Sequence, residues 1–286
     1  MAGNELTNMR LKRTLPKNRN LEQIKNHYVV EKAIAERLKK SSHEERKRIY
    51  ATMYDELFSQ VQDHPRLTRR EDEQLTKRVN KNKLAILDRF IDKSTIFAEF
   101  APGDCRFAIE VANRVKLSYG IDISDQRNPN DNVPVNFRLI VYDGYSIEEI
   151  KDNSIDVLFS DQLIEHLHPE DTKSHFELVR RILKLGGKYV FRTPHAFTGP
   201  HDVSKYFCDE PEGFHLKEWT NIELMQLLKE IGYSKVLLYW SAKGINIRLL
   251  YSYFKLCEKV IGLFPKRIRR VISKYAMPTI LCVGVK

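Results

Sequence analysis

The sequence contains little cysteine and no long apolar run. Its four cysteines lie far apart and form no C-x-x-C pair, which argues against both a disulfide framework and a zinc knuckle. No apolar stretch reaches the ~20 residues that a membrane-spanning helix needs. The first 20 residues also lack the apolar core of a signal peptide. We therefore expect a cytoplasmic protein.

Basic residues outnumber acidic residues at both ends of the chain. Residues 1–96 carry a net charge of +8 and residues 241–286 a net charge of +9, whereas residues 97–240 carry −7. The basic flanks are where an anionic partner would bind, although solvated helix faces explain them equally simply. With 42% apolar and 10% aromatic residues, the 286-residue chain can bury a sizeable core.

The first third of the chain shows helical periodicity. Apolar residues recur at helical spacing over residues 21–39, and Ser42-x-x-Glu45 has the pattern of a capping box that opens a second helix. Thr68-x-x-Glu71 predicts the start of a third helix that reaches Ile91. We expect residues 1–95 to form a basic helical appendage that acts as a lid or in dimerisation.

Short strands and helices alternate from residue 96 onward. Strands are predicted at 96–100, 117–123, 137–141, 155–160, 188–192, 235–240 and 279–285, with helices at 106–115, 170–183 and 219–231. Gly186 and Gly187 would form the turn between helix 170–183 and the next strand. This alternation predicts an α/β fold with an open, mostly parallel sheet covered on both faces. Ligands of such sheets bind beyond the carboxyl ends of the strands.

Small and acidic residues follow successive strands. Glu99 ends the first strand, and the turn Ala101-Pro-Gly103-Asp-Cys105 leads into a helix. Asp122 ends the second strand, at a spacing from Gly103 that suits hydrogen bonds to ribose hydroxyls. Asp143 follows the third strand, and Asp161 and Gln162 follow the fourth. Their order at strand ends indicates a nucleotide-like ligand site.

These stretches, with Glu165-His166-Leu and Gly186-Gly187, resemble class I S-adenosylmethionine-dependent methyltransferases of the small-molecule and sugar group. The resemblance implies a three-layer, Rossmann-like domain over residues 96–286, with seven strands and an antiparallel last strand. It differs from the family pattern in its first loop, where two of the three usual glycines are Ala101 and Cys105.

The resemblance also implies S-adenosylmethionine as the cofactor and assigns roles around it. Glu99 would bind the methionine amino end, Gly103 would pack under the cofactor, Asp122 would take the ribose hydroxyls, and Asp143 would reach the adenine amine. Further cofactor-binding candidates beside these are Ala101, Cys105, Ile123, Gly144, Asp161 and Gln162.

Histidines cluster after the fourth and fifth strands and are candidates for a general base. The predicted catalytic group is His166, His201 with Asp202, and His215. His201 and Asp202 with His166 or His195 form an alternative set of metal ligands, but they lack the i, i+4 pairing of a helical metal site. We therefore expect no metal.

The methyl acceptor is constrained only indirectly. The fourth strand ends in Ser-Asp-Gln-Leu rather than the Asn-Pro-Pro-Tyr turn that resembling enzymes use on exocyclic amines of bases, which argues against a nucleic-acid substrate. We expect O-methylation of a small molecule, a sugar, or a glycan or lipid-linked precursor. The alternatives are an RNA methyltransferase that uses the basic flanks, and a non-catalytic scaffold.

An apolar helix is predicted over residues 245–272, and it runs into the basic cluster Pro265-Lys-Arg-Ile-Arg-Arg270. This pattern is typical of helices that lie on anionic membrane surfaces. It predicts that residues 245–275 form an insertion that contacts the inner face of a membrane peripherally. The alternative is a helix that packs on the sheet or in a homodimer interface.

Overall fold

A computed structural model of the chain describes residues 10–70, 72–129 and 131–286. Its centre is one eight-stranded sheet with the order β3-β2-β1-β4-β5-β8-β6-β7. The strands are β1 (Ile96–Phe100), β2 (Leu117–Asp122), β3 (Phe137–Val141), β4 (Ile155–Asp161), β5 (Leu183–Thr193), β6 (Lys235–Ala242), β7 (Ile245–Leu249) and β8 (Ile280–Val285).

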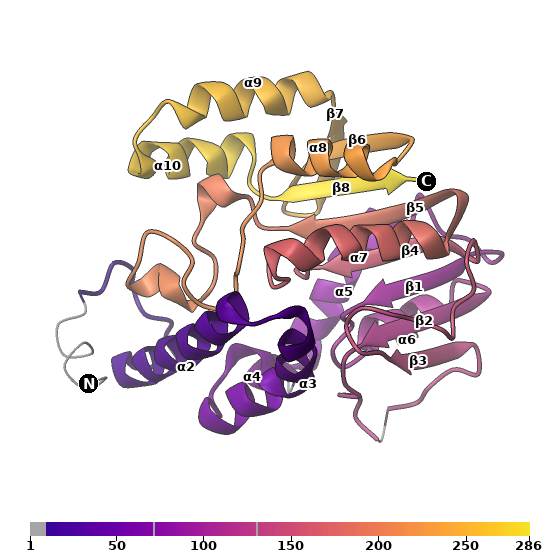
Figure 1. The fold of residues 1–286 in the computed structure, drawn as a ribbon, viewed down its shortest axis with the longest axis horizontal. Coiled ribbons are helices and arrows are strands. Elements are labelled where there is room, and N and C mark those ends of the chain that lie inside the picture. Colours follow the sequence, from indigo (N-terminus) through magenta and orange to yellow (C-terminus); the bar gives the residue numbers. More distant parts are fainter. Residues whose placement is uncertain (1–9, 71, 130) are drawn as a thin grey trace.

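Helices cover both faces of the sheet because neighbouring residues of each buried strand point to opposite sides. Phe97 and Phe159 pack with α5 (Glu73–Leu87) and α6 (Arg106–Ala112). Ala98 and Leu158 pack on the other face, with α7 (Pro169–Ile182) and α8 (Asn221–Ile231). This arrangement confirms the predicted three-layer α/β fold (Figure 1).

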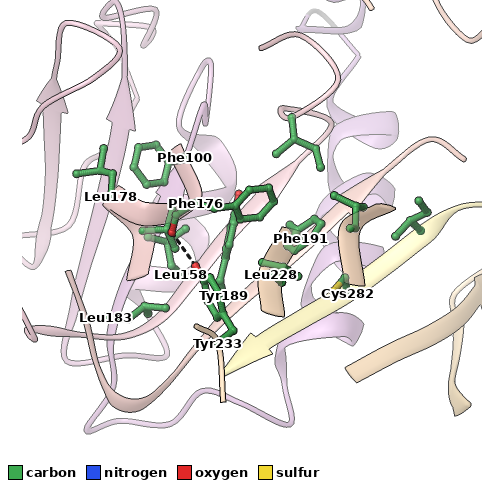
Figure 2. Packing of buried hydrophobic residues seen from close by; sticks show 14 of the residues in the cluster. Phe100, Leu158, Phe176, Leu178, Leu183, Tyr189, Phe191, Leu228, Tyr233 and Cys282 are labelled. Atoms are coloured by element: carbon green, nitrogen blue, oxygen red, sulfur yellow. Dashed lines mark hydrogen bonds between the residues drawn. The ribbon is translucent and has the colours of Figure 1, made fainter. Parts of the chain in front are cut away.

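Aromatic side chains fill the core between the sheet and α7. The rings of Phe176 and Phe191 lie 5.3 Å apart, and that of Tyr189 lies 4.9 Å from Phe191. The hydroxyl of Tyr233 donates to the carbonyl of Phe176 at 3.0 Å, so its polar atom is satisfied inside the core (Figure 2).

The end of the chain enters the sheet as predicted, but the strand count differs. β8 lies antiparallel between β5 and β6, which confirms the inverted last strand. The expected number of seven strands is wrong because β7 adds an edge strand antiparallel to β6. Lys243 and Gly244 both have positive φ, 51° and 84°, and so form the tight hairpin that reverses the chain.

Gly186 and Gly187 lie within β5 rather than in a turn before it. β5 starts at Leu183, and the pairing register with β4 shifts between Ile155 and Val157. Gly186 has a φ of +77°, and a Cβ on Gly187 would lie 2.8 Å from the carbonyl oxygen of Lys184. The two glycines therefore allow an irregularity inside the strand.

Within the described residues, four helices precede the sheet: α2 (Leu21–Lys40), α3 (His43–Gln60), α4 (Pro65–Arg70) and α5. The Ser42–Glu45 capping box opens α3 as predicted. A helix is present inside the third predicted span, but its predicted start at Thr68 is wrong, because Pro65 starts α4 and Asp72 caps α5 through the N–H of Leu75. Proline needs no N–H partner in a first helical turn, so it opens α4 there.

The N-terminal helices lie at the carboxyl ends of the parallel strands (Figure 1). α2 and α3 share an apolar cluster with Phe214 and Leu216, which lie in the segment between β5 and α8. α5 instead packs on the sheet through Leu84 and Leu87. The division of the chain at residues 95 and 96 stays a prediction.

The predicted helix over residues 245–272 is wrong. Its first five residues form β7, and the rest forms α9 (Tyr251–Gly262), followed by α10 (Lys266–Ala276). Pro265 separates the two helices and lies just before the first residue of α10. Across the described ranges, no helix is long and apolar enough to cross a bilayer.

Candidate active site

The loop after β1 is held against the end of β2. The N–H of Ala101 donates to the carbonyl of Ile121 at 2.8 Å, and the N–H of Gly103 donates to the carboxylate of Asp122 at 2.9 Å. Ala101, Gly103 and Cys105 all have positive φ, 53°, 62° and 61°. The two positions that depart from glycine thus keep the left-handed backbone that glycine would adopt without strain.

Two acidic side chains are buried beside this loop. Glu99 is 1% exposed and Asp122 is 6% exposed. Lys83 of α5 donates to one oxygen of Glu99 at 3.2 Å, and the other oxygen has no partner among the described protein groups. Burial outweighs the attraction of Lys83 and raises the pKa of Glu99 to about 7. Burial also raises the pKa of Asp122.

Two cavities lie at the carboxyl ends of the strands and meet at Ala101 and His166, which line both. The first, here called the apolar cavity, comprises about 490 Å³ of empty space including its open mouth. Its wall consists mainly of Tyr50, Met53, Tyr54, Ile121, Asp122, Ile123, Tyr142, Gly144, Leu163 and Leu167. The second, here called the polar cavity, comprises about 810 Å³ including its open mouth and is lined by Arg66, Val79, Lys83, Pro102, Gly103, Asp104, Asp161 and Gln162.

The N-terminal helices complete both cavities. α3 supplies Tyr50, Met53 and Tyr54 to the apolar cavity, and α4 and α5 supply Arg66 and Lys83 to the polar cavity. The sequence did not predict these five residues as part of the site. Their positions on helix faces gave no signal that distinguishes a cavity wall from ordinary packing.

A buried ion pair fixes α3 over the apolar cavity. Arg46 of α3 donates to both oxygens of Asp171 on α7, at 2.8 and 2.9 Å. The hydroxyls of Tyr50 and Tyr145 also donate to Asp171, at 3.2 and 2.8 Å. The carboxylate of Asp171 thus accepts four hydrogen bonds from three side chains outside its own helix.

The end of β4 contributes Asp161 and Gln162 to the polar cavity. Arg192 of β5 donates to both oxygens of Asp161 at 2.7 Å, and Lys83 lies 3.8 Å from the same carboxylate. Gln162 has a φ of 59°, and its N–H donates to the carbonyl of Arg192 at 2.8 Å. The positive φ turns the chain out of β4 toward the cavity.

Asp143 and Gly144 follow β3 as expected, but only Gly144 lines a cavity. Gly144 lines the apolar cavity, with φ +91°. The carboxylate of Asp143 accepts the N–H groups of Tyr145 and Ser146, both at 2.8 Å, and is not among the groups that line either cavity. Cys105 is fully buried under the loop, beside Gly120.

Glu165, His166 and His215 come together next to the junction of the cavities. Nδ1 of His166 donates to the carbonyl of Phe214 at 2.9 Å, and Nδ1 of His215 donates to the carboxylate of Glu218 at 2.8 Å. Burial lowers the pKa of His166 well below its usual range. Burial opposes protonation of His215 too, yet Glu218 and Glu165 raise the pKa of its imidazole.

His201 and Asp202 do not line the apolar or the polar cavity. Asp202 caps the short helix Val203–Tyr206 through the N–H of Ser204 and also accepts the N–H of Gly213 at 2.9 Å. His201 contacts Glu218 at 3.1 Å and lines a separate cavity beside α2. Glu218, which sequence reasoning missed, therefore links His201 to His215. The spacing His215-x-x-Glu218 was the available signal.

His195, considered as a metal ligand, is fully buried in a structural network. Its Nε2 lies 2.9 Å from the carboxylate of Glu258 on α9, and its Nδ1 accepts the N–H of Phe197 at 3.0 Å. Both ring nitrogens are thus satisfied away from the cavities.

Comparison with known proteins agrees with this architecture. Residues 98–191 match the family model described as a methyltransferase domain. No curated protein sequence matches the chain.

The fold resembles solved methyltransferases at low sequence identity. A chain of the complex between the Haloferax volcanii Trm112 methyltransferase activator and its methyltransferase partner has 17% identity and a TM-score of 0.53 over 75% of this chain and 93% of that one. An S-adenosylmethionine-dependent methyltransferase from Archaeoglobus fulgidus has 15% identity and a TM-score of 0.49 over 73% and 94%. The match identifies residues 98–191 as a methyltransferase domain, and the strand order with the cavities at the strand ends agrees with a Rossmann-like methyltransferase fold.

Proposed function

We propose that this methyltransferase transfers the methyl group to an oxygen atom of a small molecule, a sugar or a glycan precursor, with His166 as the general base. The observation that carries the proposal is the hydrogen bond from Nδ1 of His166 to the carbonyl of Phe214. A carbonyl only accepts, so the ring proton is on Nδ1 and Nε2 keeps a lone pair. His166 lines both cavities at the point where they meet.

The cavities fit the two ends of S-adenosylmethionine. The apolar cavity suits the adenine ring, with Asp122 placed for the ribose hydroxyls. The polar cavity suits the methionine end, where the unpartnered oxygen of Glu99 would accept from the amino group. When bound, the cofactor supplies a methyl group on a cationic sulfur, and the carboxylates of Glu99, Asp122 and Asp161 favour that charge.

Placement and proton removal are what the chain itself contributes. The helices over the cavities would exclude water and hold the acceptor at attack distance from the methyl carbon. A histidine whose pKa is lowered by burial is neutral at physiological pH, so Nε2 of His166 carries no proton, and its position at the cavity junction makes it the candidate base. His215 is less well placed, since it lines neither cavity.

The acceptor can be found by mass spectrometry of methylated metabolites and glycans in a deletion strain. With that acceptor in hand, His166→Asn should lower turnover by about 10²–10⁴-fold while calorimetry shows retained cofactor binding. His43→Asn, at a half-exposed histidine on α3, serves as the control. Unchanged turnover in His166→Asn would reject the base. Methylated nucleosides in place of glycans would indicate that RNA is the methyl acceptor. Absence of cofactor binding would indicate that the protein is a non-catalytic scaffold.

The surface of α9 and α10 supports a second proposal, peripheral contact with an anionic membrane. Apolar side chains lie exposed along both helices: Leu250, Leu256, Val260, Leu263, Phe264, Ile268, Val271, Ile272 and Tyr275. Lys266, Arg267 and Lys274 lie exposed beside them. Exposed apolar groups flanked by cations suit a layer of anionic headgroups. A lipid-linked acceptor would be presented on the same surface.

Sedimentation with liposomes tests this surface. Binding to anionic vesicles but not to zwitterionic ones is expected, and Leu263→Asp should weaken it. Leu185→Asp is the matched control, because Leu185 is similarly exposed, at 89% against 85%, but lies on β5. Absence of binding to anionic vesicles at low salt would reject the proposed membrane contact. A concentration-dependent dimer that Leu263→Asp dissociates would assign the surface to a second copy of the chain.

A further inference from the structure

The side chains of Glu165, His166 and His215 form a compact set of metal-ligating groups. One ligand atom from each residue lies within 4.8 Å of the other two. Glu165 and His166 directly follow one another in the chain, whereas His215 comes from the segment that leads into α8. The fold therefore brings one carboxylate and two imidazoles together at the edge of the cavities.

Hydrogen bonding leaves the lone pairs of this set free. Nδ1 of His166 donates to a carbonyl and Nδ1 of His215 donates to a carboxylate, so Nε2 of each neutral ring can bind a cation. Metal-binding histidines are commonly held in this way by a carbonyl or carboxylate on the other nitrogen. Glu218 and the carbonyl of Phe214 play that part here.

Glu165 supplies an independent observation. Its side chain is fully buried, and one oxygen accepts from the hydroxyl of Thr193 at 3.0 Å. The other oxygen has no partner among the described protein groups. A buried carboxylate oxygen without a donor is costly, and a bound cation would remove that cost.

A second cluster of the same composition shows the contrast. His27, Glu31 and His64 also lie within 4.8 Å of one another. Nδ1 of His27 accepts from Arg19 at 2.8 Å and Nδ1 of His64 accepts the N–H of Arg66 at 3.1 Å, so both rings carry their protons on Nε2. Those protons point toward Glu31, which lies 2.7 Å from His27. This cluster is therefore closed to a metal.

We propose that Glu165, His166 and His215 bind a divalent metal ion beside the methyl-transfer site. Two imidazoles and one carboxylate suit Mn²⁺, Fe²⁺, Co²⁺ or Zn²⁺ better than Ca²⁺. The carboxylates of Glu218 and Asp202 add negative charge around His215, whereas the charges of His215 and Arg66 act on His166.

The ion would act on the acceptor, so this role rests on the proposed O-methylation. Three protein ligands leave coordination positions open toward the cavity junction that His166 lines. A hydroxyl bound there loses its proton to solvent more readily. Its oxygen then forms the bond to the methyl carbon as the carbon–sulfur bond breaks, with the electron pair staying on sulfur. His166 would in that case bind the ion instead of taking the proton itself.

Titration of the metal-free full-length protein with Co²⁺ tests the site, by calorimetry and by visible absorption of the bound ion. One equivalent should bind, and Glu165→Gln and His215→Gln should abolish the high-affinity phase. Glu218→Gln, which alters the outer partner of His215 and leaves the three ligands in place, should weaken binding about 10–100-fold. His64→Gln in the second cluster should bind as the wild type does. Circular dichroism checks that each variant is folded.

The outcomes separate the metal from the proposed reaction. A wild-type protein that binds no Co²⁺, Mn²⁺ or Zn²⁺, or folded Glu165→Gln and His215→Gln variants that bind like wild type, would overturn the site. Chelator-treated protein that still methylates an oxygen acceptor at the full rate would overturn the metal's role and keep the proposed function. Metal binding with a product methylated on nitrogen would keep the site and reject O-methylation.

Discussion

The ammonium of Lys83 on α5 lies 3.2 Å from the carboxylate of Glu99 at the end of β1. The N-terminal helices and the sheet thus meet in an ion pair beside the polar cavity, which Lys83 lines. Lys83 satisfies one oxygen of Glu99 and leaves the other for a ligand. Glu99 is therefore both a buried group with a perturbed pKa and the candidate partner of the cofactor's amino group.

Replacing Glu99 should weaken cofactor binding. Glu99→Gln keeps the shape but removes the charge, and a lost hydrogen bond between charged groups costs about 1.5–3 kcal/mol, or roughly 10–150-fold in affinity. Calorimetry with S-adenosylmethionine measures this change. Asp125→Asn, an exposed carboxylate paired with Arg127, is the control. Equal affinities in Glu99→Gln and wild type would remove Glu99 from the site.

Glu99 should also make stability depend on pH. Its folded pKa of about 7 lies above the ordinary 4.5, so the folded state binds the proton more tightly than the unfolded state. The stability that this provides is fully present below about pH 4.5 and is lost as the pH rises through about 7. The slope approaches ~1.4 kcal/mol per pH unit within that window. Urea unfolding from pH 4.5 to 8 should show a shallower slope for Glu99→Gln, and an identical slope would contradict the assignment.

A glycine at position 101 should stabilise the protein. Ala101 has a φ of 53°, where a Cβ costs about 1 kcal/mol that glycine avoids. Ala101→Gly should therefore raise the free energy of unfolding by roughly 1 kcal/mol. The same replacement at Ala108, inside helix α6, should lower it by about 1 kcal/mol. Chemical denaturation compares the two, and destabilisation by both would show that the left-handed backbone carries no strain.

Replacing Arg46 should strongly destabilise the folded protein. The guanidinium is 3% exposed and pairs with the buried carboxylate of Asp171, so Arg46→Met leaves an uncompensated buried charge. A cost of about 3–5 kcal/mol is expected, with loosening of α3 over the apolar cavity. Arg37→Met removes an exposed pair with Glu56 and should cost less than ~1 kcal/mol. Denaturant midpoints measure both. Similar small effects would mean that the Arg46 pair does not hold α3.

The strand-end residues could be placed from the sequence because strand periodicity is local and the carboxyl ends of parallel strands share one edge. The capping box at Ser42 was equally readable. The errors arose where two local signals competed. Thr68-x-x-Glu71 has the pattern of a cap, yet Pro65 and Asp72 start the actual helices. Residues 245–249 have an apolar character that suits a helix, yet pairing with β6 makes them a strand.

The α/β order and the acidic, glycine-containing loop after the first strand could be predicted from the sequence, since both depend on residues close together in the chain. Which of the candidate histidines lie at the cavities depends on the tertiary structure. The proton on His166 is placed by Phe214, 48 residues away, and Asp202 is bound by the N–H of Gly213 and turned away from the cavities. Such long-range hydrogen bonds set the position of a proton or a carboxylate, and no local pattern encodes them.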